Sequence, residues 1–500
     1  MFSPAAGLCS VLKTVSGVYC LLLLSTYISV IINQQTHSHL KTPEREVENL
    51  LCYLYIVSCL FLLYMILYLA RLPTTHDNVK SHGTGFLRQG AVVFGLGSMM
   101  YHLLEFVEYF ILRLDPHCYA AVQSTLISGL AVVFAGLQTW VVVMLPRLNI
   151  NQATGLPHLG MMHLVATNLV IWLRALVKES LHEKEALYLN TSGGTDHHYD
   201  HSQPRLEMAE CREKYHADDY VTNVLNASSP FLYAFIIEFS LVGGTFFYNT
   251  WNSIHTKEDV LPDHTRKKKK TNLCATIAKT NWDQSSAGTL AGVFVLLLTL
   301  VDLVIFFTNI RTDEGNILEY LGKIFTTSIN FLGLIAAVTA FFKLQRLGER
   351  KHKEDNTVDL FLLNFGMFFV FVYSCFTITV GVFDTKHSIP GSVLVINGVI
   401  EIIAVTAQII LIHQLLLKTI DREDSYLYGR NLVVFLSFVN FSIWLFNTFE
   451  LQKSKASLIE ADYFGHETWI WLQRITLPVC VFFRFVLFSI YLINYLFSTE

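Results

Sequence analysis

The stretch Asn168-Leu-Val-Ile-Trp-Leu173 recurs later in the chain as Asn440-Phe-Ser-Ile-Trp-Leu445. Both copies lie inside long apolar segments. In the preceding apolar segment each copy has a glutamine, Gln138 for the first and Gln408 for the second. A duplicated membrane unit with matched polar residues in its core is typical of transporters and channels. The sequence therefore predicts two versions of one membrane hairpin, with an amide pair in each.

Composition places the chain among membrane proteins. Of its 500 residues, 52% are hydrophobic and 15% are charged, whereas roughly a quarter of a soluble domain is charged. The net charge of −4 argues against a nucleic-acid partner. The 9 cysteines show no CxxC pair and no framework spacing. We interpret them as small hydrophobes of the core rather than as disulfides or metal ligands.

Twelve segments reach the length of about 20 apolar residues that a membrane helix needs. The predicted spans are roughly 9–32, 49–70, 86–112, 118–145, 159–178, 229–251, 288–309, 316–342, 357–383, 391–417, 430–449 and 464–497. The predicted fold class is an all-α polytopic membrane protein, with twelve transmembrane helices in two six-helix halves related by pseudo-twofold symmetry.

The predicted halves are 1–251, which includes an extracellular loop at 179–227, and 288–500. A basic cytoplasmic linker at 252–287 joins them. Lys and Arg are in excess in the connections that lie inside when the N-terminus is inside, which predicts cytoplasmic termini. The sequons at Asn190 and Asn226 fall in the predicted outer loop, as N-glycosylation requires.

Ionisable residues inside spans are costly, so they are functional candidates. His102, Glu105 and Glu108 follow one another at i, i+3 and i+6, which places them on one helical stripe. Such a stripe could relay protons, or it could make structural hydrogen bonds between helices. The other candidates are Arg174, Glu238, Asp302, Glu401 and Arg484. Asn168 and Asn440 could likewise take part in a proton relay or make a structural hydrogen bond between helices.

The predicted outer loop holds His197, His198, Asp200 and His201. Imidazole and carboxylate suit Zn²⁺ or Cu²⁺, and clustered His titrates near neutral pH. The spacing matches no structural zinc motif, so a solvated loop without a metal is the alternative. We expect modulation by pH or zinc from this cluster, and we expect no resident cofactor.

Several blocks together resemble the otopetrin family. They are Gly95–Glu108, Leu159–Arg174, Phe231–Leu241, Gly429-Arg430, Asn440–Glu450, Leu477-Pro478 and Phe483-Arg-Phe485. The blocks span most of the chain and are most similar to the divergent invertebrate branch, nematode paralogues included. Two departures are Val486, where the family often has His, and Thr139-Trp140, where an aromatic pair is expected.

The resemblance implies a proton-selective channel of the plasma membrane that opens to extracellular acid. It implies a homodimer whose subunits each contain two helical barrels, with bound sterol-like lipid and modulation by zinc. Proton routes are implied within each barrel and between the halves. The residues that narrow these routes correspond to Gln138, Asn168, Gln408 and Asn440.

There are three alternative functions, and two of them are consistent with these residues. A proton-coupled secondary transporter would have the same duplication and the same buried polar groups. A structural paralogue that does not conduct would keep the fold alone. A membrane enzyme acting on lipid would need a nucleophile with a base and an orienting group, and the sequence offers no such arrangement.

Overall fold

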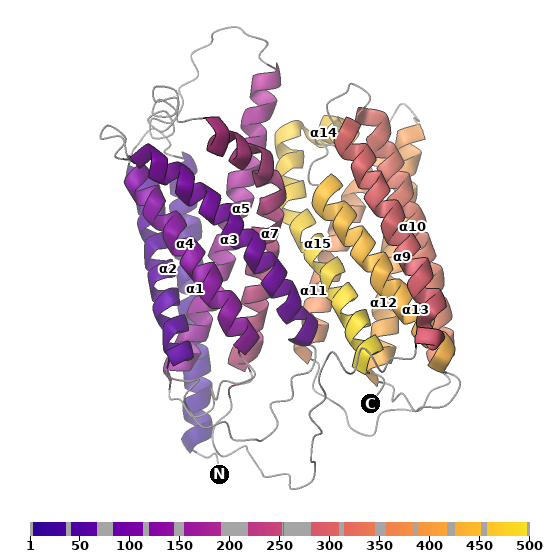
Figure 1. The fold of residues 1–500 in the computed structure, drawn as a ribbon, viewed down its shortest axis with the longest axis horizontal. Coiled ribbons are helices and arrows are strands. Elements are labelled where there is room, and N and C mark those ends of the chain that lie inside the picture. Colours follow the sequence, from indigo (N-terminus) through magenta and orange to yellow (C-terminus); the bar gives the residue numbers. More distant parts are fainter. Residues whose placement is uncertain are drawn as a thin grey trace. The chain divides into compact units, whose positions relative to one another are not determined.

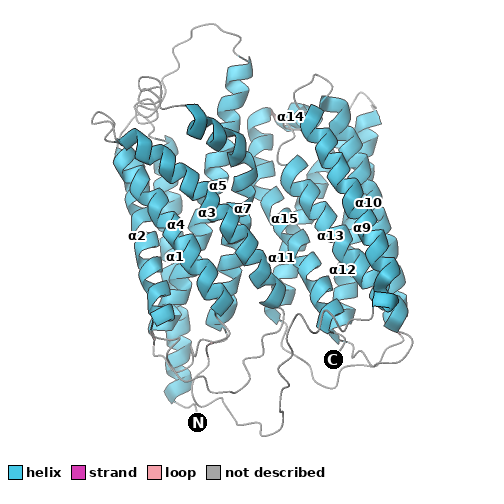
Figure 2. Ribbon diagram, in the orientation of Figure 1, coloured by secondary structure: helices cyan, strands magenta, loops and turns pink. Residues whose placement is uncertain are grey.

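The structure is a computed structural model of the chain. It describes residues 4–36, 42–67, 84–113, 120–144, 155–191, 219–252, 254, 282–309, 315–345, 357–383, 389–417, 426–451 and 458–497. Within these ranges every regular element is a helix (Figure 2).

Twelve helices are long and apolar enough to cross a membrane, which confirms the predicted number of spans. They are α1 (Pro4–Thr36), α2 (Thr42–Leu67), α3 (Thr84–Arg113), α4 (Ala120–Met144), α5 (Leu156–Thr191), α7 (Asp219–Asn252), α9 (Trp282–Asn309), α10 (Gly315–Leu344), α11 (Thr357–Phe383), α12 (Ile389–Leu417), α13 (Tyr426–Phe446) and α15 (His466–Phe497). A π-helical turn (Asn447–Leu451) extends α13, and the short helix α14 (Leu458–Phe464) precedes α15.

The chain divides into two compact units, 1–266 and 267–500, and each contains six of the long helices (Figure 1). In the first unit, neighbouring helices form a closed ring in the order α1, α2, α4, α3, α7, α5. In the second unit the order is α9, α10, α12, α11, α15, α13. The two rings have the same order when the helices of each unit are numbered along the chain. The repeat seen in two short motifs therefore extends to the topology of both units.

Two helices extend into the predicted outer loop. Residues 179–227 were expected as a loop, but α5 continues to Thr191 and α7 already begins at Asp219. The segment after Ser180 reads Leu-His-Glu-Lys-Glu-Ala-Leu, and Leu, Glu, Lys and Ala are strong helix formers. Asn190 consequently lies in the last turn of α5, and Asn226 lies in α7 before its apolar part.

Small residues in α3 allow close helix packing in the first unit. A Cβ added to Gly97 would lie 2.5 Å from Cγ of Phe235 on α7. One added to Gly95 would lie 3.0 Å from Cε2 of Phe239 and would overlap the side chain of Thr139. These contacts show that Gly95 and Gly97 allow close packing of α3 against its neighbours.

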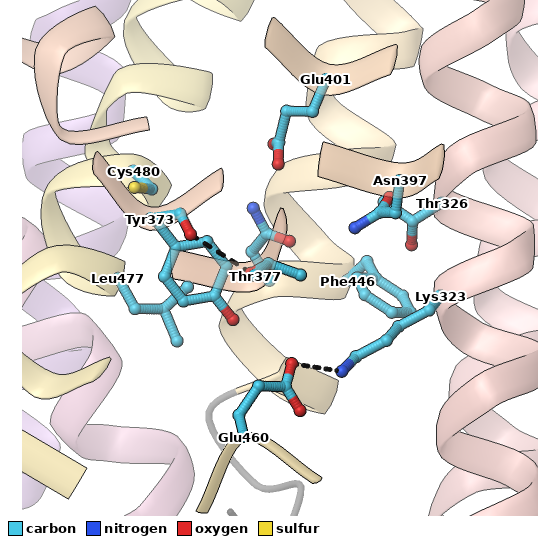
Figure 3. Close-up of a pocket in the computed structure, with 11 residues that line it drawn as sticks. Lys323, Thr326, Tyr373, Thr377, Asn397, Glu401, Phe446, Glu460, Leu477 and Cys480 are labelled. Carbon is cyan, nitrogen blue, oxygen red and sulfur yellow. Dashed lines mark hydrogen bonds and ion pairs between the residues drawn. The ribbon is translucent and has the colours of Figure 1, made fainter. Parts of the chain in front are cut away.

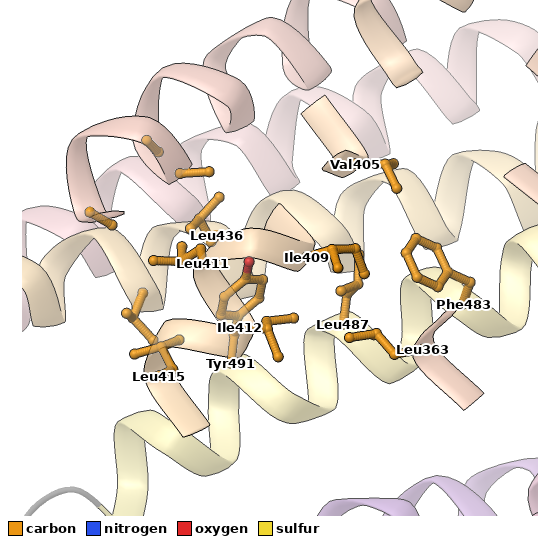
Figure 4. Packing of buried hydrophobic residues seen from close by; sticks show 14 of the residues in the cluster. Leu363, Val405, Ile409, Leu411, Ile412, Leu415, Leu436, Phe483, Leu487 and Tyr491 are labelled. Carbon is orange, nitrogen blue, oxygen red and sulfur yellow. The ribbon is translucent and has the colours of Figure 1, made fainter. Parts of the chain in front are cut away.

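A buried apolar cluster holds α12 in the second unit (Figure 4). Ile409 and Ile412 on α12 pack with Leu436 on α13 and with Leu487 and Tyr491 on α15. Because lipid tails are as apolar as these side chains, the gain comes from close packing rather than from removal of water. The packing fixes the rotation of α12 and so directs Gln408, the residue before Ile409, inward, where it is fully buried.

Candidate functional site

The first amide pair joins α4 to α5. Gln138 Nε2 donates to Asn168 Oδ1 over 2.9 Å, and Asn168 Nδ2 donates to Gln138 Oε1 over 2.8 Å. Asn168 Nδ2 also donates to the carbonyl of Leu164 over 2.8 Å. Both side chains are fully buried. The pair is reciprocal, so each amide satisfies the other.

Gly243 on α7 covers this first pair. A Cβ added there would overlap Gln138 Nε2 and would lie 2.7 Å from Asn168 Oδ1. No larger residue fits without displacing one of the two amides. The close approach of α7 therefore depends on glycine at this position.

The second amide pair joins α12 to α13. Asn440 Nδ2 donates to Gln408 Oε1 over 2.7 Å and to the carbonyl of Leu436 over 2.8 Å. The Asn440 Oδ1 accepts from Nη1 of Arg484 on α15 over 3.4 Å. Gln408 Nε2 is buried and has no hydrogen-bond partner within the part of the chain that the structure describes. The second pair therefore has a single amide–amide hydrogen bond, from Asn440 to Gln408. Asn440 Oδ1 accepts from the Arg484 guanidinium instead of from Gln408.

Arg484 is the centre of a buried polar cluster in the second unit. Its Nη2 donates to Glu401 Oε1 over 2.9 Å and to Asn330 Oδ1 over 3.1 Å. The other oxygen of Glu401 accepts from Ser374 Oγ over 3.1 Å. Arg484 is fully buried, and a buried guanidinium needs a carboxylate partner to be tolerated. Glu401 supplies that partner.

A comparable carboxylate cluster lies in the first unit. Glu105 on α3 accepts from Lys178 Nζ over 2.7 Å and contacts His102 Nδ1 at 3.3 Å. The hydroxyl of Tyr101 lies 3.4 Å from Glu105 Oε1 and 3.0 Å from the hydroxyl of Tyr233, and it can donate its one hydrogen to either. These groups line a cavity together with Arg174. A hydrogen-bonded series of hydroxyl, imidazole and carboxylate groups can transfer a proton from one group to the next.

The second unit also contains a polar cavity (Figure 3). It encloses about 490 Å³, part of which is open to the surroundings. Figure 3 shows the carboxylate of Glu401 directed into it at one end, with Lys323 and Glu460 at the other. Lys323 Nζ lies 2.9 Å from Glu460 Oε1, and both side chains are buried.

Side chains of Thr326, Thr377, Asn397 and Asn447 line the wall between the two ends of this cavity. Pro478 lies in α15 beside the lining residues Leu477 and Cys480. Proline cannot donate to the carbonyl one turn earlier, so it frees a polar group near the cavity. The π-helical turn that follows α13 also interrupts the regular hydrogen bonding of its helix. Such turns are frequent at functional sites.

The remaining predicted residues lie outside these clusters. Glu108 and Glu238 are buried on α3 and α7, and Asp302 is half-buried on α9. They are not among the residues that line the two cavities. The cluster of His197, His198, Asp200 and His201 falls outside the described residues, as do the side chains of Asn190 and Asn226. Among the described residues, no group of three His, Cys, Asp or Glu side chains is placed to hold a metal ion.

Sequence reasoning missed three residues of the second unit. Lys323 and Asn330 lie inside the eighth predicted span, where any ionisable or amide side chain is a signal. Glu460 gave no such signal, because it lies in the connection between two spans. The carboxylate of Glu460 reaches Lys323 only because α14 packs against α11 and α15.

Comparison with known proteins identifies the family. The family model described as Otopetrin matches residues 86–216 and 191–485, which include both amide pairs and both carboxylate clusters. The chain belongs to the otopetrin family.

Among curated relatives of this otopetrin, the Drosophila melanogaster "Proton channel OtopLc" is 24% identical over 440 residues. That match covers 81% of the chain but only 27% of the relative. The mouse "Proton channel OTOP2" is 20% identical, with 88% of the chain and 87% of the relative covered. The human "Proton channel OTOP2" is 21% identical with the same coverage.

Proposed function

We propose that this otopetrin is a proton-selective channel. Two observations support the proposal together. Relatives that match most of the chain are named proton channels. Each unit also carries a fully buried amide pair and a carboxylate bonded to a cation inside a ring of membrane helices.

The amide pairs favour protons over other cations. A Na⁺ or K⁺ ion would have to lose its water to pass the narrow site at Gln408 and Asn440, and these amides offer few oxygens to replace that water. A proton moves by exchange along hydrogen bonds and needs no free space of that size. Selectivity then comes from the narrowness of the polar sites.

The finer features of the proposal follow from the family and from the sequence. We propose that the channel lies in the plasma membrane with both termini cytoplasmic, and that it works as a homodimer with sterol-like lipid at its surfaces. We propose that extracellular acid opens it and that the outer-loop cluster at His197, His198, Asp200 and His201 tunes its response to acid or zinc. The exposed apolar side chains of α9, such as Leu290 and Phe294, suit a lipid-facing surface.

Purified protein in liposomes tests the proposal. An internal pH dye reports proton entry while valinomycin and potassium set the membrane potential. A channel acidifies the liposomes whenever the proton gradient and potential drive protons inward, in the presence of any second solute or none. A proton-coupled transporter acidifies them only when its second solute is present. A structural paralogue gives the rate of empty liposomes, and that outcome contradicts the proposal.

A further inference from the structure

The two amide pairs meet different residues of the sixth helix of their unit. In the first unit α7 presents Gly243, which has no side chain, to Gln138 and Asn168. In the second unit α15 presents Arg484, which donates to Asn440. The two rings share one topology and one pair of amides, so this exchange of glycine for arginine is a specific difference between them.

Arginine dictates how the amides of the second unit are oriented. A guanidinium only donates hydrogen bonds, so any amide that faces it must present its oxygen. The Oδ1 atoms of Asn440 and Asn330 both face Arg484 for this reason. The Nδ2 of Asn440 then donates to the Oε1 of Gln408. The hydrogen bonds are therefore donated in sequence from Arg484 to Asn440 and from Asn440 to Gln408. The Nε2 of Gln408 is the last donor in this series.

Three buried N–H groups of this cluster have no hydrogen-bond partner among the described residues. They are Gln408 Nε2, Asn330 Nδ2 and Arg484 Nε, and all three residues are fully buried. Nearly every buried N–H group in a native protein has an acceptor, so these donors indicate a small bound acceptor. The first unit differs, because Gln138 and Asn168 each use both their oxygen and their nitrogen on the other.

Gly333, which has no side chain, lies beside one of these donors, Gln408 Nε2. It lies one turn beyond Asn330 on α10, and a Cβ added to it would stand 3.6 Å from Gln408 Nε2 and 3.1 Å from Cγ1 of Val439. The acceptor is small and neutral, because Glu401 already balances the charge of Arg484. Water fits this description, and it also carries protons of its own that it can pass on.

We propose that the second unit binds one water at Gln408 Nε2 and another at Asn330 Nδ2 and relays protons through them: each water accepts a proton on the lone pair that the amide leaves free and releases one of its own protons to the next acceptor. The closed pair of Gln138 and Asn168 makes the first unit a plug. Arg484 is a positioning residue, because its hydrogen bond to Asn440 sets the orientation of the Asn440 and Gln408 amides. This inference rests on the proposed proton channel and assigns its route within one subunit.

Two glycine variants test the route by whole-cell proton current, normalised to protein at the cell surface. Gly333→Ala fills the space beside Gln408 and is expected to lower the current about tenfold, the effect of losing one hydrogen-bonded step. Gly244→Ala places a Cβ 3.6 Å from Cβ of Asn168 in the first unit and is expected to leave the current within about twofold. If Gly244→Ala abolishes the current and Gly333→Ala does not, the route lies in the first unit and the inference is wrong. A wild-type chain without current would instead contradict the proposed function.

Radiolytic footprinting of the purified protein tests the bound water directly, because hydroxyl radicals made from internal water label the side chains beside it. Val439 and Val170 are both fully buried next to an amide pair, the first beside Asn440 and the second two residues from Asn168. We expect Val439 to be oxidised several-fold faster than Val170. Arg484→Lys keeps a cation for Glu401 but cannot donate to both Asn440 and Asn330. The variant should therefore remove the difference in oxidation rate between Val439 and Val170, at unchanged thermal stability. Equal rates in the wild type would overturn the inference.

A halide ion would also accept from N–H groups, and ion replacement separates it from water. Gluconate is too large for the site, so it is substituted for chloride on both sides of the membrane. The proton current and the labelling of Val439 should both persist. Loss of either in gluconate would show that the acceptor is an anion and would contradict the assignment of water.

Discussion

Lys323 on α10 and Glu460 on α14 form a buried ion pair in the second unit, with 2.9 Å between Nζ and Oε1. Only 6% of the lysine side chain and 1% of the glutamate side chain are exposed. The pair ties a seven-residue helix, which is too short to be stable alone, to the long helices of the ring. It closes one end of the cavity whose other end holds Glu401.

Removing one member of this pair should destabilise the protein strongly. Lys323→Met leaves Glu460 buried without its cation, and Glu460→Met leaves the lysine without its anion. Each is expected to cost about 3–5 kcal/mol, whereas the double variant should recover most of that loss. Thermal unfolding in detergent measures the effect. Additive losses in the double variant would show that the two residues do not interact.

Alanine substitutions at two glycines should have opposite effects on stability. Gly97→Ala places a Cβ 2.5 Å from Phe235 and is expected to cost about 1–3 kcal/mol. Gly17→Ala on α1 meets no atom within 4 Å and should stabilise that helix by up to about 1 kcal/mol. The same unfolding assay compares them. A Gly97→Ala variant as stable as the wild type would contradict the close packing of α3 on α7.

Neutralising Glu401 should lower proton flux, because its carboxylate lies in the second unit, beside the proposed route. Glu401→Gln keeps the shape of the side chain but removes its charge and its ability to exchange a proton. We expect the current to fall about tenfold or more, as for loss of a positioned acid or base. Glu46→Gln is the control, because that carboxylate is exposed at the start of α2. A matching loss in both variants would point to surface charge and not to the cluster.

The outer-loop residues His197, His198, Asp200 and His201 should tune the channel without carrying protons. Replacing all four with Ala is expected to shift the dependence of current on external pH or zinc. The shift should be modest, because exposed charges are screened within about 8–10 Å. Dose–response recordings at several pH values measure it. Loss of all current at normal surface level would instead place the loop on the route.

Much of the fold could be predicted because each feature had a local signal. The apolar runs gave the twelve spans, and the repeated Asn-x-x-Ile-Trp-Leu motif led to Gln138–Asn168 and Gln408–Asn440, which the structure brings into contact. Hydrophobicity and internal repetition carry information of this kind.

Other features had no local signal. The partner of Lys323 is Glu460, which is far from it in sequence and lies between spans, so only packing brings the two together. The different bonding of the two amide pairs depends on Arg484, whose contacts follow from the rotation of α15. The extension of α5 to Thr191 was missed because hydropathy marks the membrane boundary, whereas helix propensity sets the end of the helix.

The reversal potential of the acid-evoked current tests the central claim most directly. Whole-cell recordings from cells expressing the chain would step external pH at fixed internal pH, with Na⁺ and K⁺ exchanged for a large organic cation. The proposed proton channel predicts a reversal potential that moves by about 59 mV for each pH unit and is unchanged by the cation exchange. A reversal potential that follows Na⁺ or K⁺ and ignores pH would contradict it.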